Sequence, residues 1–198
     1  MTAKSIEAIV EEIFSLYDKY GGEEYAGEQV SQLEHMCQSA QLAEESEYDT
    51  EVILAAFLHD IGHICVSSFG SNGMDGYGIM NHEKVGGAYL KARGFSERLI
   101  RLVQGHVDAK RYLTWKYPDY YEQLSEASKI TLGYQGGKMS SGEAEQFEKD
   151  LLFPLMIEMR RIDEAAKELN KPLPHLEKYK VMMKEYLQSQ NKDILNSN

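Results

Sequence analysis

The stretch VILAAFLHDIGH, residues 52–63, decides the fold of this chain. Its seven apolar residues, Val52 to Leu58, lead without a break into the pair His59-Asp60. An uninterrupted apolar run of this kind indicates a buried segment. A buried carboxylate is costly unless a metal ion or another cation compensates its charge. The stretch therefore predicts a buried helix that ends in candidate metal ligands.

Helical periodicity extends on both sides of this stretch, and no long run alternates apolar and polar residues as a half-buried strand would. The fold class is therefore all-α. An apolar stripe from Ile6 to Tyr17 predicts a first helix, and Ser31 with Glu34 predicts a capping box that starts a second helix running to about Ser46. We expect further helices from Asp49 into His59-Asp60, from Asn81 to Gly94, from Ser96 through His106, and over residues 125–134, 156–169 and 176–187.

Two segments between these helices are predicted to be irregular. The glycine-rich loop from Gly70 to Gly78 cannot pack a core, so we expect it at the surface. Pro118 breaks the aromatic segment from Tyr112 to Tyr121.

Length and composition predict one domain over residues 1–198, with a core of about residues 5–187. A chain of 198 residues with 42% apolar composition can bury one sizeable core but is short for two domains. It has no apolar window long enough for a membrane span, and acidic residues interrupt its first twenty positions. We therefore expect a cytoplasmic protein without a membrane partner. Two cysteines, Cys37 and Cys65, fit a reducing compartment and are expected to be inert buried thiols.

The charge balance argues against nucleic acid as a partner. Lys and Arg total 21 against 32 Asp and Glu, a formal charge of -11, so most of the surface should repel phosphate backbones. A small anionic ligand can still bind where a few cations gather locally.

Histidines cluster in one part of the chain and point to a metal site. Five of the six fall between positions 35 and 106: His35, His59, His63, His82 and His106. Imidazole and carboxylate ligands suit iron, manganese or zinc, and the absence of a cysteine pair at ligand spacing argues against a structural zinc cluster. If the helix persists, His59 and His63 share one face, while Asp60 points about 100° away and can bridge two ions.

Six motifs together resemble one subgroup of the HD superfamily: QLEH (32–35), LHDIGH (58–63), His82, GHVDAK (105–110), QGG (135–137) and RRID (160–163). The subgroup is the PhnZ-like mixed-valent diiron oxygenases, which cleave the C–P bond of 1-hydroxyalkylphosphonates. The resemblance covers about residues 5–187 and implies an HD-domain helical bundle. It also implies that one iron is held by His35, His59, Asp60 and Asp163, and that Asp60 bridges to a second iron held by His82 and His106.

The resemblance further implies a reaction and a set of partners. An Fe(II)/Fe(III) pair is expected to bind the substrate hydroxyl at one metal and dioxygen at the other, after which the oxidised carbon loses phosphate. The implied substrate is a 1-hydroxy-2-(amino or trimethylammonio)ethylphosphonate, giving phosphate and glycine or glycine betaine. Spacing alone chooses neither the metal nor the nitrogen substituents.

Around the phosphonate, the resemblance places His63, Lys110, Ser128 and Arg160, whose chemistry suits an anion. It makes the segment before His35 a movable cover, in which Tyr25 occupies the open iron position and Glu28 contacts the cationic nitrogen of the substrate. Tyr77, Tyr112 and Trp115 are alternative aromatic partners for a trimethylammonium group, although core packing is their ordinary role. His175 is expected at the surface.

Two other interpretations remain open on the sequence. In an HD-type metal-dependent phosphohydrolase, the metals would activate water against a phosphate ester without redox chemistry. A noncatalytic metal-binding module would load metal and turn over neither substrate class. The complete ligand set and the candidate anion donors count against the noncatalytic module. Asn81-His82-Glu83 is similar to the dinuclear phosphodiesterase branch, but the Asp-Gly-x-Gly-Tyr-Pro continuation expected there is missing.

Overall fold

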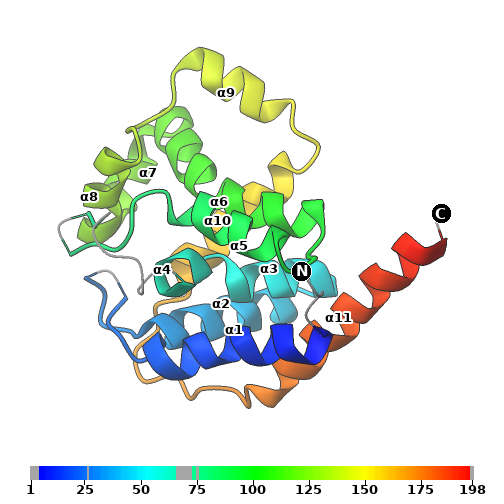
Figure 1. Ribbon diagram of the computed structural model, residues 1–198. Helices are drawn as coiled ribbons and strands as arrows, with labels where there is room; N and C mark the ends of the chain where they lie inside the picture. The colour runs from blue at the N-terminus through cyan, green and yellow to red at the C-terminus, as the bar shows by residue number, and fades with distance from the viewer. Residues whose placement is uncertain (1–4, 26, 66–72, 75, 197–198) are drawn as a thin grey trace.

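The computed structural model describes residues 5–25, 27–65, 73–74 and 76–196, and in these ranges it is all-helical, as predicted (Figure 1). None of the described helices combines the length and apolar composition that a bilayer crossing requires. The helices are α1 (Ile6–Tyr20), α2 (Gln32–Glu45), α3 (Thr50–Leu58), α4 (Ile61–Cys65), α5 (His82–Lys91), α6 (Glu97–Lys116), α7 (Pro118–Gln123), α8 (Glu126–Tyr134), α9 (Ser141–Glu148), α10 (Phe153–Ala165) and α11 (Glu177–Asn196).

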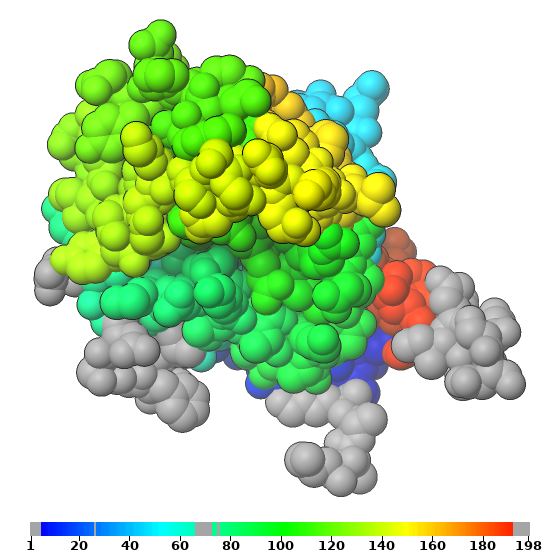
Figure 2. Space-filling model, turned by 90° about the horizontal axis from the view of Figure 1, so that it is seen from above, coloured from blue at the N-terminus to red at the C-terminus, as the bar shows by residue number. Residues whose placement is uncertain are grey.

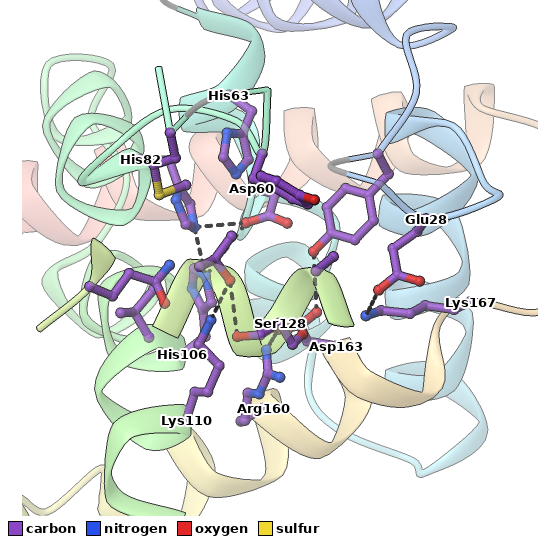
Figure 3. Close-up of a pocket in the computed structure, with 17 residues that line it drawn as sticks. Glu28, Asp60, His63, His82, His106, Lys110, Ser128, Arg160, Asp163 and Lys167 are labelled. Carbon is purple, nitrogen blue, oxygen red and sulfur yellow. Dashed lines mark hydrogen bonds and ion pairs between the residues drawn. The ribbon is translucent and has the colours of Figure 1, made fainter. Parts of the chain in front are cut away.

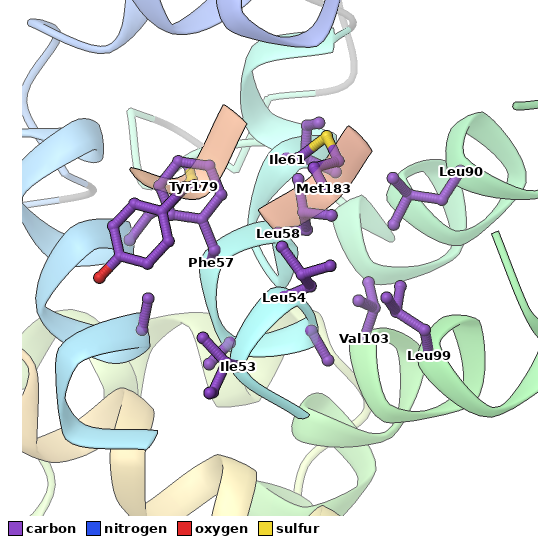
Figure 4. Close-up of a cluster of buried hydrophobic side chains, with 14 of the residues drawn as sticks. Ile53, Leu54, Phe57, Leu58, Ile61, Leu90, Leu99, Val103, Tyr179 and Met183 are labelled. Carbon is purple, nitrogen blue, oxygen red and sulfur yellow. The ribbon is translucent and has the colours of Figure 1, made fainter. Parts of the chain in front are cut away.

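Helix α3 lies at the centre of the fold, where α2, α6, α10 and α11 pack around it. Every residue from Val52 to Leu58 is buried, because the helix is apolar on all sides and each face must meet another apolar surface. Figure 4 shows the result: one side of α3 meets α6 and another meets α11, with the facing residues Leu54, Phe57, Leu58, Leu99, Val103, Tyr179 and Met183.

Side-chain caps place the helix starts where the sequence predicts them. The Ser31 hydroxyl accepts a hydrogen bond from the Glu34 amide, and the Glu34 carboxylate accepts one from the Ser31 amide at 2.6 Å. Ser96 caps α6 in the same way through the Leu99 amide. Asn81 precedes α5 as predicted, but its side chain makes no capping bond.

The third predicted helix is interrupted where it reaches the candidate metal ligands His59 and Asp60. Helix α3 stops at Leu58 and α4 begins at Ile61, so His59 and Asp60 lie in the junction between two helices. The prediction that this helix continues unbroken into His59-Asp60 is therefore wrong by two residues. The conditional expectation that His59 and His63 share one helix face fails with it.

Gly62 lets α5 approach this junction closely. A Cβ at position 62 would lie 1.9 Å from the carbonyl oxygen of His82, a distance that no side chain tolerates. The missing side chain therefore brings the start of α5, and with it His82, against the end of α3.

A second apolar cluster joins the far end of α6 to α9 and α10. Tyr112 and Leu113 of α6 pack there with Ile157 of α10, and Phe147 and Phe153 complete the cluster. Figure 2 shows the yellow segment that includes α9 crossing over the green residues of α5 and α6. Helix α9 itself was not predicted, because its sequence SGEAEQFE carries too little apolar periodicity to stand out.

The glycine-rich loop differs from its prediction in the part that the structure describes. Met74 is 1% exposed and Tyr77 lines the candidate site, so this end of the loop packs inward. Gly78 lies against the His63 ring, since a Cβ there would sit 2.5 Å from it. Positions 66–72 and 75 lie outside the described residues.

Because α3 lies at the centre of the core, truncating one of its buried side chains should lower the stability of the fold strongly. Leu54→Ala should lower the free energy of unfolding by about 2–5 kcal/mol, because it deletes a fully buried side chain and leaves a cavity. Urea unfolding of both variants measures this effect. Leu151→Ala is the matched control, since Leu151 is 94% exposed, and should change stability by less than about 0.5 kcal/mol. Equal losses in the two variants would contradict the central role of α3.

Candidate metal centre

Three buried side chains from three helices form a first group of candidate ligands. His35 comes from α2, His59 from the junction directly after α3 and Asp163 from α10, and their ligand atoms all lie within 4.8 Å of one another. The His35 Nε2 atom is 3.1 Å from His59 Nε2 and 3.3 Å from Asp163 Oδ1. Two imidazoles and a carboxylate at this spacing can hold one metal ion.

A second group lies beside the first. The Nε2 atoms of His82 and His106 are 3.0 Å apart, and the Oδ1 atom of Asp60 is 3.1 Å from the former and 3.5 Å from the latter. His82 opens α5 and His106 lies in the middle of α6, so the close approach of α5 to α4 assembles this group.

Asp60 faces both groups, one oxygen to each; Figure 3 shows the oxygen that faces His82. Its Oδ2 atom is 3.3 Å from His59 Nε2 and 3.6 Å from His35 Nε2, whereas its Oδ1 atom faces the second pair. Asp60 is 1% exposed, and Oδ1 has no hydrogen-bond partner. A buried carboxylate with a free oxygen between two imidazole pairs has the geometry of a bridging ligand.

Backbone carbonyls orient all four imidazoles in the same sense. Because a carbonyl oxygen can only accept, each ring keeps a proton on Nδ1, so Nε2 is the atom that faces inward and can bind a metal. Within each pair, the two Nε2 atoms lie 3.0–3.1 Å apart, close enough to share one cation. Burial lowers the pKa of His59, but Asp60 and Asp163 raise it more, to about 9, so without a metal a proton on His59 serves as that cation. Each Nδ1 donates to a backbone carbonyl oxygen: His35 to Ala166 (2.9 Å), His59 to Ala56 (2.8 Å), His82 to Ile79 (3.2 Å) and His106 to Val103 (2.7 Å).

His63 has the opposite orientation. The Ile79 amide donates a hydrogen bond to His63 Nδ1 at 3.0 Å, so the neutral ring carries its proton on Nε2. Burial and the neighbouring His82 hold the pKa of His63 well below its usual value, which keeps the ring neutral. Position alone groups His63 with Asp60 and His82, but this tautomer offers a hydrogen-bond donor in place of a metal lone pair.

The two buried aspartates are held ionised. Burial raises the pKa of Asp60, but the neighbouring His59 and His82 lower it further, to well below the usual range. Burial likewise raises the pKa of Asp163, and the Arg160 guanidinium with His35 lowers it more. The candidate ligands therefore include two full negative charges, which suit a pair of cations.

Cationic donors lie on the other side of the same pocket (Figure 3). Arg160 pairs through Nη1 with Asp163 and donates from Nε to Glu164 at 2.8 Å, while its buried Nη2 has no partner. Lys110 is 4% exposed and donates to Thr131 at 2.9 Å. Burial and the charge of Arg160 lower the pKa of Lys110 to about 7. Ser128 lines the pocket with them.

The segment before α2 reaches into this pocket from the N-terminal side. The Tyr25 ring stacks on His35 with centroids 3.9 Å apart, and its hydroxyl lies 3.5 Å from Asp163 Oδ1. Glu28 also lines the pocket, where its carboxylate accepts hydrogen bonds from Ser125 and Lys167. Both residues therefore line the same pocket as several candidate metal ligands, and Lys167 is a partner of Glu28 that the sequence analysis did not identify.

Ten of the twelve predicted site residues line one pocket, and the other two, His35 and His59, lie against Asp60 at its edge. Several neighbours were missed. The sequence analysis did not single out four of these neighbours: Tyr120, Thr131, Glu164 and Lys167. The only local signal for two of them is helical spacing, since Glu164 follows Arg160 by four residues and Lys167 follows Asp163 by four. Of the alternative aromatic partners, only Tyr77 lines the pocket, since Tyr112 and Trp115 pack in the second apolar cluster. His175 is exposed, as predicted.

The tautomers predict which histidines determine metal content. His82→Ala should lower the content from two metal ions per chain toward one, because it removes an inward lone pair. His63→Gln should leave it at two, because the Gln side chain can still accept from the Ile79 amide. Elemental analysis of proteins loaded in parallel measures both. Loss of metal from the His63 variant equal to that from the His82 variant would overturn the tautomer assignment.

Comparison with known proteins agrees with this centre. The HD domain family model matches residues 33–133. An uncharacterised protein of Acanthamoeba polyphaga mimivirus is 43% identical over 185 residues, which are 93% of this chain and 84% of that protein.

Two further relatives have named activities. A [1-hydroxy-2-(trimethylamino)ethyl]phosphonate dioxygenase (glycine-betaine-forming) of Leisingera caerulea is 42% identical over 84% of each chain. A hydroxymethylphosphonate dioxygenase of Gimesia maris is 35% identical over 86% of this chain and 84% of its own. With its paired buried His/Asp groups, the chain belongs to the HD domain family and is related to the phosphonate dioxygenases of that family.

Proposed function

We propose that this protein is a diiron oxygenase that cleaves the C–P bond of a 1-hydroxy-2-(amino or trimethylammonio)ethylphosphonate, giving phosphate and glycine or glycine betaine. One observation carries the proposal. Asp60, which lies between the two imidazole pairs, lines one pocket with His82, His106, Lys110 and Arg160, whose Nη2 has no partner. A site for redox metals thus adjoins a site for a small anion.

The proposed cofactor is a pair of iron ions, Fe(II) and Fe(III). We assign His35, His59 and Asp163 to one ion, His82 and His106 to the other, and Asp60 to both. When bound, the pair supplies the activation of dioxygen and the oxidation of C1. The reaction balances with one dioxygen: the C–P bond breaks, C1 gains an oxygen as carboxylate, and phosphorus gains one as phosphate.

The residues of the chain anchor and orient the phosphonate in this scheme. The free Arg160 Nη2 and the Lys110 ammonium donate to its oxygens, and Ser128 and the Nε2–H of His63 add neutral donors. Glu164 and Tyr120 hold the guanidinium from its outer edge, so its inner edge stays directed at the pocket. Such fixed donors hold C1 beside the metal pair in one geometry.

Tyr25 and Glu28 form the cover on the remaining side. We assign Tyr25 to the open metal position before substrate arrives, which its contact with His35 and Asp163 supports. Glu28, which is partly buried, meets the cationic nitrogen of the substrate.

The first test measures phosphate release with and without oxygen. Anaerobically iron-loaded protein is given the amino and trimethylammonio hydroxyphosphonates and hydroxymethylphosphonate, and metal content is determined on the same sample. We expect oxygen-dependent release from at least one cationic substrate, with two irons per chain. Oxygen-independent release, or activity on phosphate esters alone, would replace the proposal with a metal-dependent phosphohydrolase. Metal loading without any turnover would indicate a noncatalytic module.

The lowered pKa of Lys110 predicts that substrate binding depends on pH. With a pKa of about 7, this lysine is cationic below neutrality and loses its charge as the pH rises. The KM for a hydroxyphosphonate should therefore increase as the pH rises above about 7, and Lys110→Arg should flatten that rise because guanidinium stays charged. Steady-state kinetics from pH 6 to pH 9 measure both. The same rise in the Arg variant would exclude Lys110 as its source.

A further inference from the structure

The carboxylate of Glu28 already has a cationic partner within the chain. The Nζ atom of Lys167 lies 2.6 Å from Glu28 Oε1, and the Ser125 hydroxyl donates to the same oxygen at 2.6 Å (Figure 3). Glu28 and Lys167 keep only 17% and 18% of their side-chain surface exposed, and both line the pocket. The position assigned to the substrate's nitrogen therefore lies beside a lysine ammonium.

The backbone of Lys167 is held in place by its neighbours, and its long side chain reaches into the pocket. It follows α10 directly, between Ala166, whose carbonyl accepts from His35, and Glu168, whose backbone makes two hydrogen bonds to the Gln38 side chain, each 2.9 Å long. The long lysine stem carries a single mobile charge. Its Nζ atom is also 5.8 Å from the centre of the Tyr25 ring, within reach of the proposed cover.

One carboxylate cannot pair fully with two cations in a partly buried site. An incoming ammonium or trimethylammonium group must share Glu28 with Lys167 or displace it, and either costs free energy because like charges repel at short range. A hydroxyphosphonate without a cationic group leaves the Glu28–Lys167 pair intact. The lysine therefore penalises one class of substrate and leaves the other unaffected.

We propose that Lys167 is a specificity-determining residue that competes with the cationic nitrogen of the substrate for Glu28. This inference rests on the proposed function, and it names a residue that sets how strongly the pocket prefers cationic over uncharged substituents at C1.

The test is calorimetric titration without oxygen, which measures binding in the absence of turnover. Iron-loaded wild type and Lys167→Met are titrated with 1-hydroxy-2-(trimethylammonio)ethylphosphonate and with hydroxymethylphosphonate. Removing the competing charge should tighten binding of the trimethylammonio ligand by about tenfold, equivalent to about 1.4 kcal/mol, and should not tighten binding of hydroxymethylphosphonate.

Three further variants make the result specific. Lys167→Arg keeps a cation beside Glu28 and should retain the wild-type preference. Lys91→Met removes an exposed lysine outside the pocket and should change neither affinity. In a Glu28→Gln background, Lys167→Met should no longer improve binding of the cationic ligand, because the group for which the two cations compete is gone.

Two different failures can be told apart. If wild type binds both phosphonates but Lys167→Met leaves their affinity ratio unchanged, or weakens the cationic ligand, the competition model is overturned and the proposed function stands. If iron-loaded wild type binds neither phosphonate, the proposed function fails and this inference falls with it.

Discussion

The buried carboxylate of Asp60 is the constraint on which the rest of the structure depends. It lies between two imidazole pairs with one oxygen toward each, and one of those oxygens has no hydrogen bond. Such a charge is tolerated inside a protein only beside cations. The apolar helix α3 carries it to the centre, Gly62 lets His82 approach, and the Ala166 carbonyl turns His35 toward it.

An acidic protein concentrates positive charge at one place to accommodate an anion. The chain carries a formal charge of -11, yet Lys110 and Arg160 lie buried in the same pocket. Arg160 links the two parts of the site, because one nitrogen pairs with the candidate ligand Asp163 while another remains unpartnered. The candidate metal ligands and the candidate anion donors are therefore linked through a single side chain.

In the proposed function, chemistry and selectivity occupy different sides of this pocket. The imidazole pairs and the anion donors come from α2 to α10, whereas Glu28 comes from the segment before α2 and meets Lys167 just after α10. Relatives with named activities act on hydroxyphosphonates that differ in the substituent at C1, one cationic and one without it. A separate selectivity contact allows that substituent to vary while the metal site and the phosphonate site stay the same.

The sequence by itself determined the helical class, the main helix starts and the set of candidate ligands. The class and the helix starts follow from apolar periodicity and capping residues, which are local signals. The histidine cluster and the His-Asp pair after a buried run indicated a metal site, and the full ligand set came from the resemblance of the motifs to a known subgroup. Tertiary structure decided the break at His59 and Asp60, the opposite tautomer of His63 and the inward packing of Tyr77. It also paired Glu28 with Lys167, which lie 139 residues apart. These depend on contacts between distant segments, and such contacts leave no periodic or local signal in the chain.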